Sequence, residues 1–181
     1  MIVCFINYED KYIENVNKAI SKIYNIFEPT KIYIYHDNVY KGGYDKRAQV
    51  VTKNRNMGAL WARKYLIESI PSEYDDEQLI WIDSDDGIKE DAVKYIFETY
   101  NNYEKDLVSA KHNNVLVWNK VMRVSLFKKA ASFIPDYKYE LNFSYKEDVL
   151  YSAIIDKIIE NNYIIDYNID YIQYSGRHYP L

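Results

Sequence analysis

Short apolar runs alternate with amphipathic stretches along the first 110 residues, and this alternation constrains the fold more than any other feature. Several runs have the length and the β-branched or aromatic content of strands, at 2–6, 31–35, 49–52, 78–82 and 107–110. Apolar residues at helical spacing predict helices over 13–27, 56–70, 92–97, 125–131 and 148–160. This order predicts right-handed crossovers and an α/β fold, with a mainly parallel central sheet covered by helices on its faces.

Size and composition fit one domain that spans residues 1–181. A chain of 181 residues, 48% of them hydrophobic, is long enough to bury a substantial core. Glycine (5) and proline (4) are scarce, which excludes low-complexity linkers and collagen-like repeats. The single cysteine, Cys4, excludes a disulfide framework and a cysteine-rich zinc site, and its apolar neighbours predict a core position.

Charge and hydropathy limit the partners and the location that we expect. The 23 basic and 27 acidic residues give a net charge of -4, which argues against a duplex-DNA binder held by a basic face. No apolar run approaches the ~18 residues of a membrane helix. The N-terminal run at 2–6 lacks a basic flank and a cleavage site, so it predicts a strand and not a signal peptide. We therefore expect a cytoplasmic protein without a membrane span.

Three of the predicted strands end in polar or acidic clusters, at 7–10, 36–38 and 83–86. The carboxyl ends of parallel strands lie at the same edge of a sheet, and ligands of open α/β sheets bind just outside that edge. We therefore expect these three clusters to gather on one rim and to form the binding site.

The acidic cluster Asp83-Ser84-Asp85-Asp86 is the strongest chemical signal in the sequence. Carboxylates at alternate positions after a buried strand can present oxygens to one hard cation, and Mg²⁺ and Mn²⁺ prefer oxygen ligands. A cation held there can clamp a diphosphate and stabilise it as a leaving group. The structural alternative is a solvated turn in which Asp85 or Asp86 caps the next helix.

The acidic cluster, after the apolar run at 79–82, resembles the DxD(D) motif of GT-A glycosyltransferases, especially family 2. Five further stretches resemble family motifs in the expected order: 6–8 (INY, without the usual proline), 35–38 (YHDN), 56–63 (NMGALWAR), 117–123 (VWNKVMR) and 145–149 (YKEDV). Each motif is weak alone, but six in order are specific. The resemblance implies a GT-A, nucleotide-diphospho-sugar transferase-like fold of three α/β/α layers, in one compact domain.

The resemblance also implies donor-binding residues. Asp37 would contact the base of a nucleotide-sugar, with Tyr8 near its ring. Asn56 would belong to the donor site, and Arg63 would serve the nucleotide or the diphosphate. Asp83 would lie near the ribose and the metal. The donor implied is a UDP-sugar.

Metal binding and catalysis follow from the same resemblance. Asp85 would be the main ligand of Mn²⁺ or Mg²⁺, and Asp148 would be the general base that deprotonates the acceptor hydroxyl. Such a base must lie within hydrogen-bond reach of that hydroxyl, opposite the leaving diphosphate, which gives inversion at the anomeric carbon. In the C-terminal stretch, His178 could be a third metal ligand or contact the diphosphate, and Arg177 could pair with phosphate.

Trp118, Lys120 and Glu147 would bind the acceptor, and the W-N-K stretch favours a glycan. Lipid-linked sugars, proteins and modified nucleobases also remain open as acceptors, although binding to nucleic acid is otherwise not expected. The 21 tyrosines could provide a sugar-stacking surface or the interface of a homo-oligomer.

Most of these residues also have a structural alternative. Asp37 could be a turn residue, Asn56 and Gly58 could simply start a helix, and Arg63 could be a surface cation. The others have similar alternatives: packing for Trp118, solvated charges for Lys120 and Arg123, an ordinary surface residue for His178, and acids at a helix N-terminus for Glu147 and Asp148.

Two other functions compete with a glycosyltransferase. The small size and the missing proline favour a non-catalytic GT-A-like module that binds a nucleotide or a glycan. A nucleotidyltransferase on a related sheet would also use carboxylates and Mg²⁺, but no glycine-rich loop with Lys or Arg follows Ile6.

Overall fold

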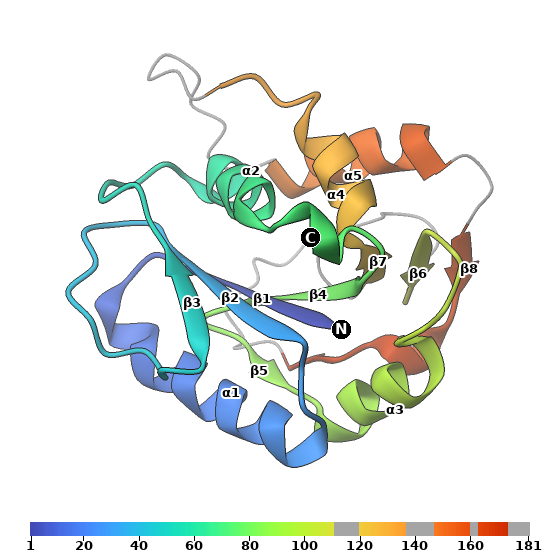
Figure 1. Cartoon of the computed structure of the whole chain (residues 1–181), viewed down its shortest axis with the longest axis horizontal. Helices are drawn as coiled ribbons and strands as arrows, with labels where there is room; N and C mark the ends of the chain where they lie inside the picture. Colours follow the sequence, from blue (N-terminus) through green and yellow to red (C-terminus); the bar gives the residue numbers. More distant parts are fainter. Residues whose placement is uncertain (111–119, 137–146, 160–162, 174–181) are drawn as a thin grey trace, which may run out of the picture.

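The computed structural model describes residues 1–110, 120–136, 147–159 and 163–173, and it leaves the side chains of 147–149 undescribed. Its centre is a seven-stranded sheet in the order β3-β2-β1-β4-β7-β6-β8 (Figure 1). The strand bounds are β1 Ile2–Asn7, β2 Lys31–His36, β3 Ala48–Val51, β4 Gln78–Asp83, β6 Leu107–Ser109, β7 Lys120–Arg123 and β8 Tyr163–Ile165. β1 pairs in parallel with β2 and β4, and β2 with β3, whereas β7 is antiparallel to both of its neighbours. The predicted, mainly parallel sheet is confirmed.

Helices cover both faces of this sheet, as Figure 1 shows. The helices are α1 Ile13–Ile26, α2 Ala59–Ser69, α3 Glu90–Tyr100, α4 Val124–Ala131 and α5 Glu147–Ile159. One apolar core lies between the sheet and α2, α4 and α5, and a second lies between the sheet and α1 and α3. The fold is therefore a three-layer α/β/α sandwich, as the sequence predicts. Cys4 is fully buried in the first core.

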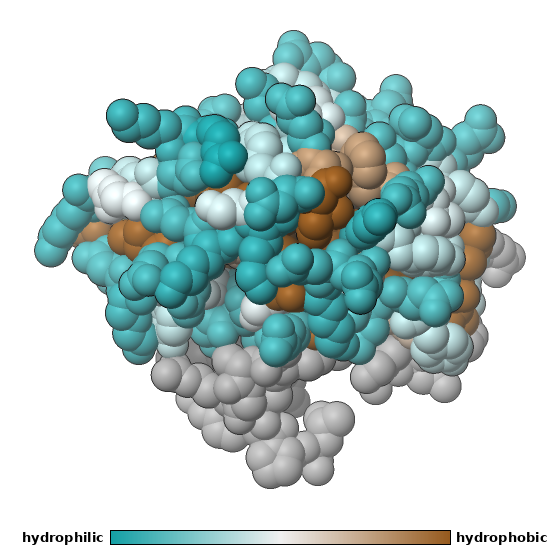
Figure 2. Space-filling model, turned by 90° about the horizontal axis from the view of Figure 1, so that it is seen from below, coloured by the Kyte–Doolittle hydropathy of each residue, from teal (hydrophilic) through white to brown (hydrophobic). Residues whose placement is uncertain are grey.

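The outer face over α1 and α3 is mainly hydrophilic, and its apolar areas are small and separate (Figure 2). The two helices pack against the sheet through apolar side chains on their inner sides. Phe27, just after α1, stacks on Phe97 of α3 with ring centroids 4.2 Å apart. None of the helices in the described ranges is long and apolar enough to cross a bilayer.

Two short strands that the sequence does not predict connect the acidic cluster to the end of the described chain. β5 (Gly87–Ile88) pairs antiparallel with β9 (Ile172–Gln173), and Gly87 lies opposite Gln173. A Cβ atom at Gly87 would lie 3.3 Å from Gln173 Oε1, so a larger residue there would require a small shift of the Gln173 side chain. Short 3₁₀ turns occur at Asp10–Tyr12, Ser72–Tyr74 and Tyr167–Ile169.

β4 and β7 pair over only two residues, and a tyrosine then bridges the gap between them. The hydroxyl of Tyr171 accepts a hydrogen bond from the backbone N–H of Trp81 (3.2 Å) and donates one to the carbonyl of Trp81 (2.9 Å). The same hydroxyl lies 3.3 Å from the carbonyl of Lys120 on β7. Tyr171 thus satisfies backbone groups that a continuous ladder would pair.

Candidate functional site

The three polar strand ends gather on one rim, as predicted. In the sheet register Asn7 lies beside His36, and Ile6 lies beside Asp83. The last carbonyls of β1 hold both neighbours: Ile6 accepts from Ser84 N (2.9 Å), and Asn7 accepts from Asp37 N (2.6 Å). β1 therefore fixes the spacing between the acidic cluster and the end of β2.

Asp83 is bound by an arginine from α2. Arg63 Nη2 donates to both carboxylate oxygens of Asp83, at 2.8 and 3.1 Å. The Arg63 side chain is 3% exposed, and that of Asp83 is 23% exposed. The guanidinium also lies over the indole of Trp81, 6.0 Å from the ring centroid. The alternative of a surface cation at Arg63 is therefore wrong.

Asp85 faces the tyrosine at the end of β1. Burial, followed by the nearby negative charges of Asp85 and Asp83, holds the pKa of Tyr8 well above its usual value. The Tyr8 hydroxyl is consequently neutral at physiological pH and lies near this carboxylate. The alternative that Asp85 or Asp86 caps the next helix is wrong, since α3 starts at Glu90 and its N-cap is Lys89.

The donor set at this rim fits a divalent cation only in part. Carboxylate oxygens are suitable ligands for Mg²⁺ or Mn²⁺, and Asp85 offers them. Asp83 shares both of its oxygens with Arg63. Within the ranges that the structure describes, no group of three or more His, Cys, Asp or Glu side chains is placed to hold a metal. A cation here would depend on Asp85, on phosphate oxygens of a ligand and on water.

Asp37 is buried below the rim and binds the backbone that precedes α2. Its two carboxylate oxygens accept from the N–H groups of Met57 (2.5 Å) and Gly58 (2.8 Å). Burial raises the pKa of Asp37 to about 6, although both hydrogen bonds oppose the shift. Asn56 lies in the same loop, where its side-chain oxygen accepts from Gly58 N (3.0 Å). Asn56 and Gly58 thus do start the helix, and a contact with the nucleotide stays a prediction.

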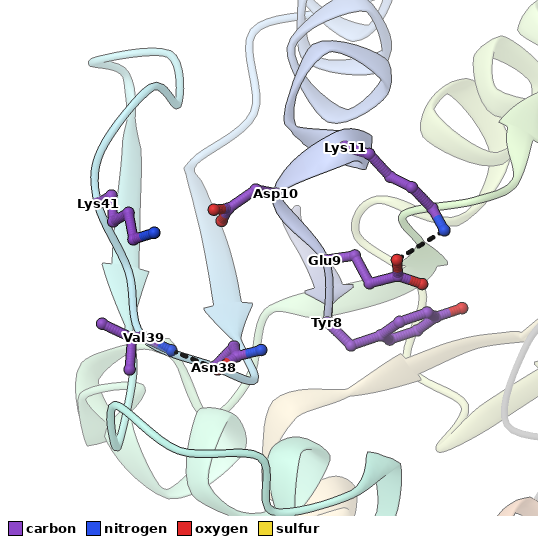
Figure 3. A pocket seen from close by; sticks show the side chains of 7 residues that line it. All are labelled: Tyr8, Glu9, Asp10, Lys11, Asn38, Val39 and Lys41. Atoms are coloured by element: carbon purple, nitrogen blue, oxygen red, sulfur yellow. Dashed lines mark hydrogen bonds and ion pairs between the residues drawn. The ribbon is translucent and has the colours of Figure 1, made fainter.

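A pocket of about 370 Å³ opens between the loop after β1 and the loop after β2 (Figure 3). Its lining residues are Tyr8, Glu9, Asp10, Lys11, Asn38, Val39 and Lys41. Asp10 and Lys41 point toward each other from the two loops, and Lys11 pairs with Glu9 at 2.6 Å. The pocket offers charged and polar groups beside the Tyr8–Asp85 contact.

Polar contacts, some of them buried, hold the outer loop of this pocket in place. The hydroxyl of Tyr44 contacts the side-chain amide of Asn7 and lies 2.8 Å from His36 Nδ1. Asn17 of α1 donates to the carbonyl of Gly43 and accepts from Asp45 N, both at 2.8 Å. The sequence did not indicate that Lys11, Lys41 and Tyr44 belong to this site. The Gly42-Gly43 pair predicted a loop but not the pocket beside it.

On the acceptor side, the structure describes only part of the predicted site. Lys120 starts β7 beside Ser109 and is 1% exposed, so the alternative of a solvated charge is wrong for this residue. The side chain of Arg123 is partly buried and donates to the carbonyl of Glu104 (2.7 Å). Trp118, Arg177 and His178 lie outside the described residues, as do the side chains of Glu147 and Asp148.

The backbone of Glu147 and Asp148 forms the first turn of α5, and the next turn locates this helix. Tyr151 packs edge-on against Phe127 of α4, with centroids 5.6 Å apart. Burial raises the pKa of Tyr151, and the positive charge of Arg63 opposes that shift. The start of α5 is thus close to the helix that carries Arg63.

Solved structures with the same architecture identify the fold. Neither a known family model nor a curated protein sequence matches the chain. A crystal structure of residues 1–349 of S. aureus TarS, a GT-A glycosyltransferase, with UDP-GlcNAc superposes with a TM-score of 0.68 at 16% identity, and the match covers 99% of this chain. The chain has a GT-A-like fold. It spans 59% of the length of that TarS chain.

A nucleotidyltransferase shares this GT-A-like fold. The crystal structure of a 4-diphosphocytidyl-2C-methyl-D-erythritol synthase superposes with a TM-score of 0.62 at 9% identity. The match covers 97% of this chain and 92% of the synthase. Both neighbours support the fold, and their low identities leave the activity of this chain to be argued from its own residues.

Proposed function

We propose that this chain is a metal-dependent, inverting glycosyltransferase that moves a sugar from a UDP-sugar to a hydroxyl group of a glycan. The observation that carries the proposal is the position of Asp83 and Asp85 at the end of β4, next to Tyr8 and the pocket after β1. The neighbour bound to UDP-GlcNAc supports a nucleotide-sugar as the donor.

In this proposal the base and ribose occupy the pocket, and the diphosphate extends toward Asp85. The formal charges of the pocket lining balance, with Lys11 and Lys41 against two acids, which suits the uncharged base and ribose. Arg63 neutralises Asp83, so the rim carries less negative charge than its sequence implies. Asp85, with His178 as a candidate second ligand, would hold Mn²⁺ or Mg²⁺, which would neutralise charge on the departing nucleoside diphosphate.

The position of β9 supports a contribution from the C-terminal stretch. Gln173 pairs with Gly87, directly after the acidic cluster. An extended chain covers at most about 3.6 Å per residue, so a segment of five residues after Gln173 can span up to about 18 Å.

In this proposal, the acceptor binds at the part of the rim formed by β6, β7 and the start of α5. Asp148, in the first turn of α5, would accept the proton of the attacking hydroxyl. β6 is parallel to β8 and antiparallel to β7, so β6 ends and β7 starts on the side of the sheet where β4 ends. Both ends of the segment that contains Trp118 are thus anchored on the rim side. Lys120 and Glu147 complete the proposed acceptor region.

The test is donor turnover. The purified chain is incubated with UDP-GlcNAc, UDP-glucose and GDP-mannose, with and without Mn²⁺, and binding, hydrolysis and transfer to glycan acceptors are measured. We expect one UDP-sugar to bind and to be turned over only with the metal. Absence of binding and turnover with every donor, together with no effect of Asp85→Ala on any readout, would refute the proposal.

A nucleotidyltransferase is the second candidate, because the synthase neighbour has nearly the same length as this chain. Such an enzyme would release pyrophosphate from a nucleoside triphosphate, whereas the glycosyltransferase would release a nucleoside diphosphate. A pyrophosphate assay with CTP and UTP separates the two. A non-catalytic module would bind the donor, show no turnover on any acceptor, and keep its affinity in Asp148→Asn.

A further inference from the structure

Asp37 joins three elements at one buried point. Its backbone N–H donates to the carbonyl of Asn7 at the end of β1 (2.6 Å), and its own position directly follows β2. Its carboxylate accepts from the backbone of Met57 and Gly58, just before α2. With 2% of its surface exposed, Asp37 is almost closed to solvent.

The position of Asp37 is poorly suited to contact a base. The pocket beside it is lined by the next residues, Asn38 and Val39, and Asp37 is not among the lining residues. Each of its carboxylate oxygens already accepts one backbone hydrogen bond. Charge-assisted bonds of this kind are strong and directional, so they fix the segment that donates them.

The segment that Asp37 fixes determines where α2 begins. Gly58 has a φ of 78°, which residues with a side chain rarely adopt, and its carbonyl accepts the first helical bond from Ala62 N (2.9 Å). Arg63 follows Ala62 in the rigid helix. The start of α2 therefore sets the position of the guanidinium that holds Asp83.

We propose that Asp37 is a positioning residue: it acts on the diphosphate end of the donor site through the start of α2 and Arg63, and it does not touch the base. The nature of the ligand rests on the proposed function, whereas the mechanical link from Asp37 to Arg63 does not.

Two variants disturb the contact between Asp37 and the start of α2, one at the carboxylate and one at the backbone that donates to it. Asp37→Asn keeps the size of the side chain but leaves only one oxygen to accept, and its amide group then faces a backbone donor. Gly58→Ala keeps Asp37 but strains the backbone at the helix start, because φ is positive there. The added Cβ causes no steric clash, since no other atom lies within 4 Å of it. Asp91→Asn is the matched control: it changes an exposed aspartate in the first turn of α3, outside the pocket lining.

The measurement compares UDP with uridine, each titrated in the presence of Mg²⁺. A positioning role predicts that both Asp37→Asn and Gly58→Ala weaken UDP binding by on the order of tenfold, the size of a lost charge-assisted hydrogen bond. Uridine binding stays within twofold of the original, and Asp91→Asn changes neither. An equal loss for uridine and UDP in Asp37→Asn, with no loss in Gly58→Ala, would mean that Asp37 contacts the base and would overturn the inference.

A second readout does not depend on any nucleotide. Hydrogen exchange at the amides of Met57 and Gly58 is measured in the original chain and in Asp37→Asn, and unfolding is measured in Asp37→Asn, Arg63→Lys and the double variant. We expect faster exchange and non-additive losses of stability, because the two residues act on one element. Unchanged exchange and additive losses would overturn the link. Intact coupling in a chain that binds no nucleotide would refute only the proposed function.

Discussion

Arg63 and Asp83 form a largely buried ion pair where β4 leaves the sheet, with Nη2 at 2.8 and 3.1 Å from the two carboxylate oxygens. This pair gives the two aspartates of the acidic cluster different surroundings. Asp83 is engaged by a permanent cation from α2, whereas Asp85 faces the neutral hydroxyl of Tyr8. We expect the two residues to differ in what they contribute to binding and to stability.

Asp85 is expected to matter for ligand binding and little for folding. Asp85→Ala removes the carboxylate assigned to the cation, and we expect turnover of the donor to fall by about 100-fold, the usual scale for losing one main electrostatic contact. Its thermal unfolding should stay close to that of the original chain. Asp91→Asn, an exposed acid in the first turn of α3, is the control and should retain full turnover. Equal turnover in Asp85→Ala and Asp91→Asn would contradict the assignment.

Arg63 is expected to matter for stability as well. Arg63→Gln leaves the Asp83 carboxylate without its main cation in a largely buried place, so we expect the free energy of unfolding to fall by about 3 kcal/mol. Urea unfolding followed by circular dichroism measures it. Lys18→Gln disrupts the exposed pair with Glu14 (2.7 Å) and should change stability by less than about 0.5 kcal/mol. Similar effects of the two substitutions would show that the buried pair adds nothing.

Asp37 should make stability depend on pH in the opposite sense from most acids. Burial raises its pKa to about 6, so the folded chain binds a proton more readily than the unfolded chain does. The stability linked to this group is fully present below the unfolded pKa of about 4 and is lost as the pH rises through about 6. Relative to Asp37→Asn, the original chain should gain about 2 kcal/mol between pH 7 and pH 4. His36 is retained in both proteins, so its own titration cancels to first order; a constant difference across this range would contradict the prediction.

The hydroxyl of Tyr171 should add to stability beyond the packing of its buried ring. Tyr171→Phe keeps the ring but leaves the N–H and the carbonyl of Trp81 without this partner in the interior. We expect a loss of about 2 kcal/mol, the penalty for an unsatisfied buried polar group. Tyr167→Phe removes a hydroxyl from a ring that is 74% exposed and should be neutral. Chemical unfolding of the two variants side by side gives the comparison.

The sequence predicts the elements with strong local patterns. β1, β2 and β4 are continuous apolar runs because both faces of these strands are buried, and their polar ends therefore mark the rim. β7 is different: it has four residues, starts with Lys120 and ends with Arg123, so composition does not distinguish it from a loop. Its burial depends on neighbours far away in the sequence.

Some residues of the candidate site can likewise be predicted from local sequence patterns, whereas the contacts of others depend on packing. The positions of Asp83, Asp85 and Tyr8 follow from the strand ends, which local pattern reveals. The partners of Arg63 and Asp37 each lie about 20 residues away along the chain, and no periodicity connects them. Sequence reasoning could nominate these residues, but only the packing of α2 on the sheet decides what they bind.

The reversed direction of β7 gives this architecture a natural place for diversification. Because β6 finishes and β7 begins at the edge where Asp83 lies, the link between them can be lengthened or rewritten without changing a strand. The half proposed to bind the donor, built on β1, β2 and β4, stays constant while that happens. Under the proposed function, a lineage of such chains could therefore exchange one acceptor for another and leave its nucleotide chemistry unaltered.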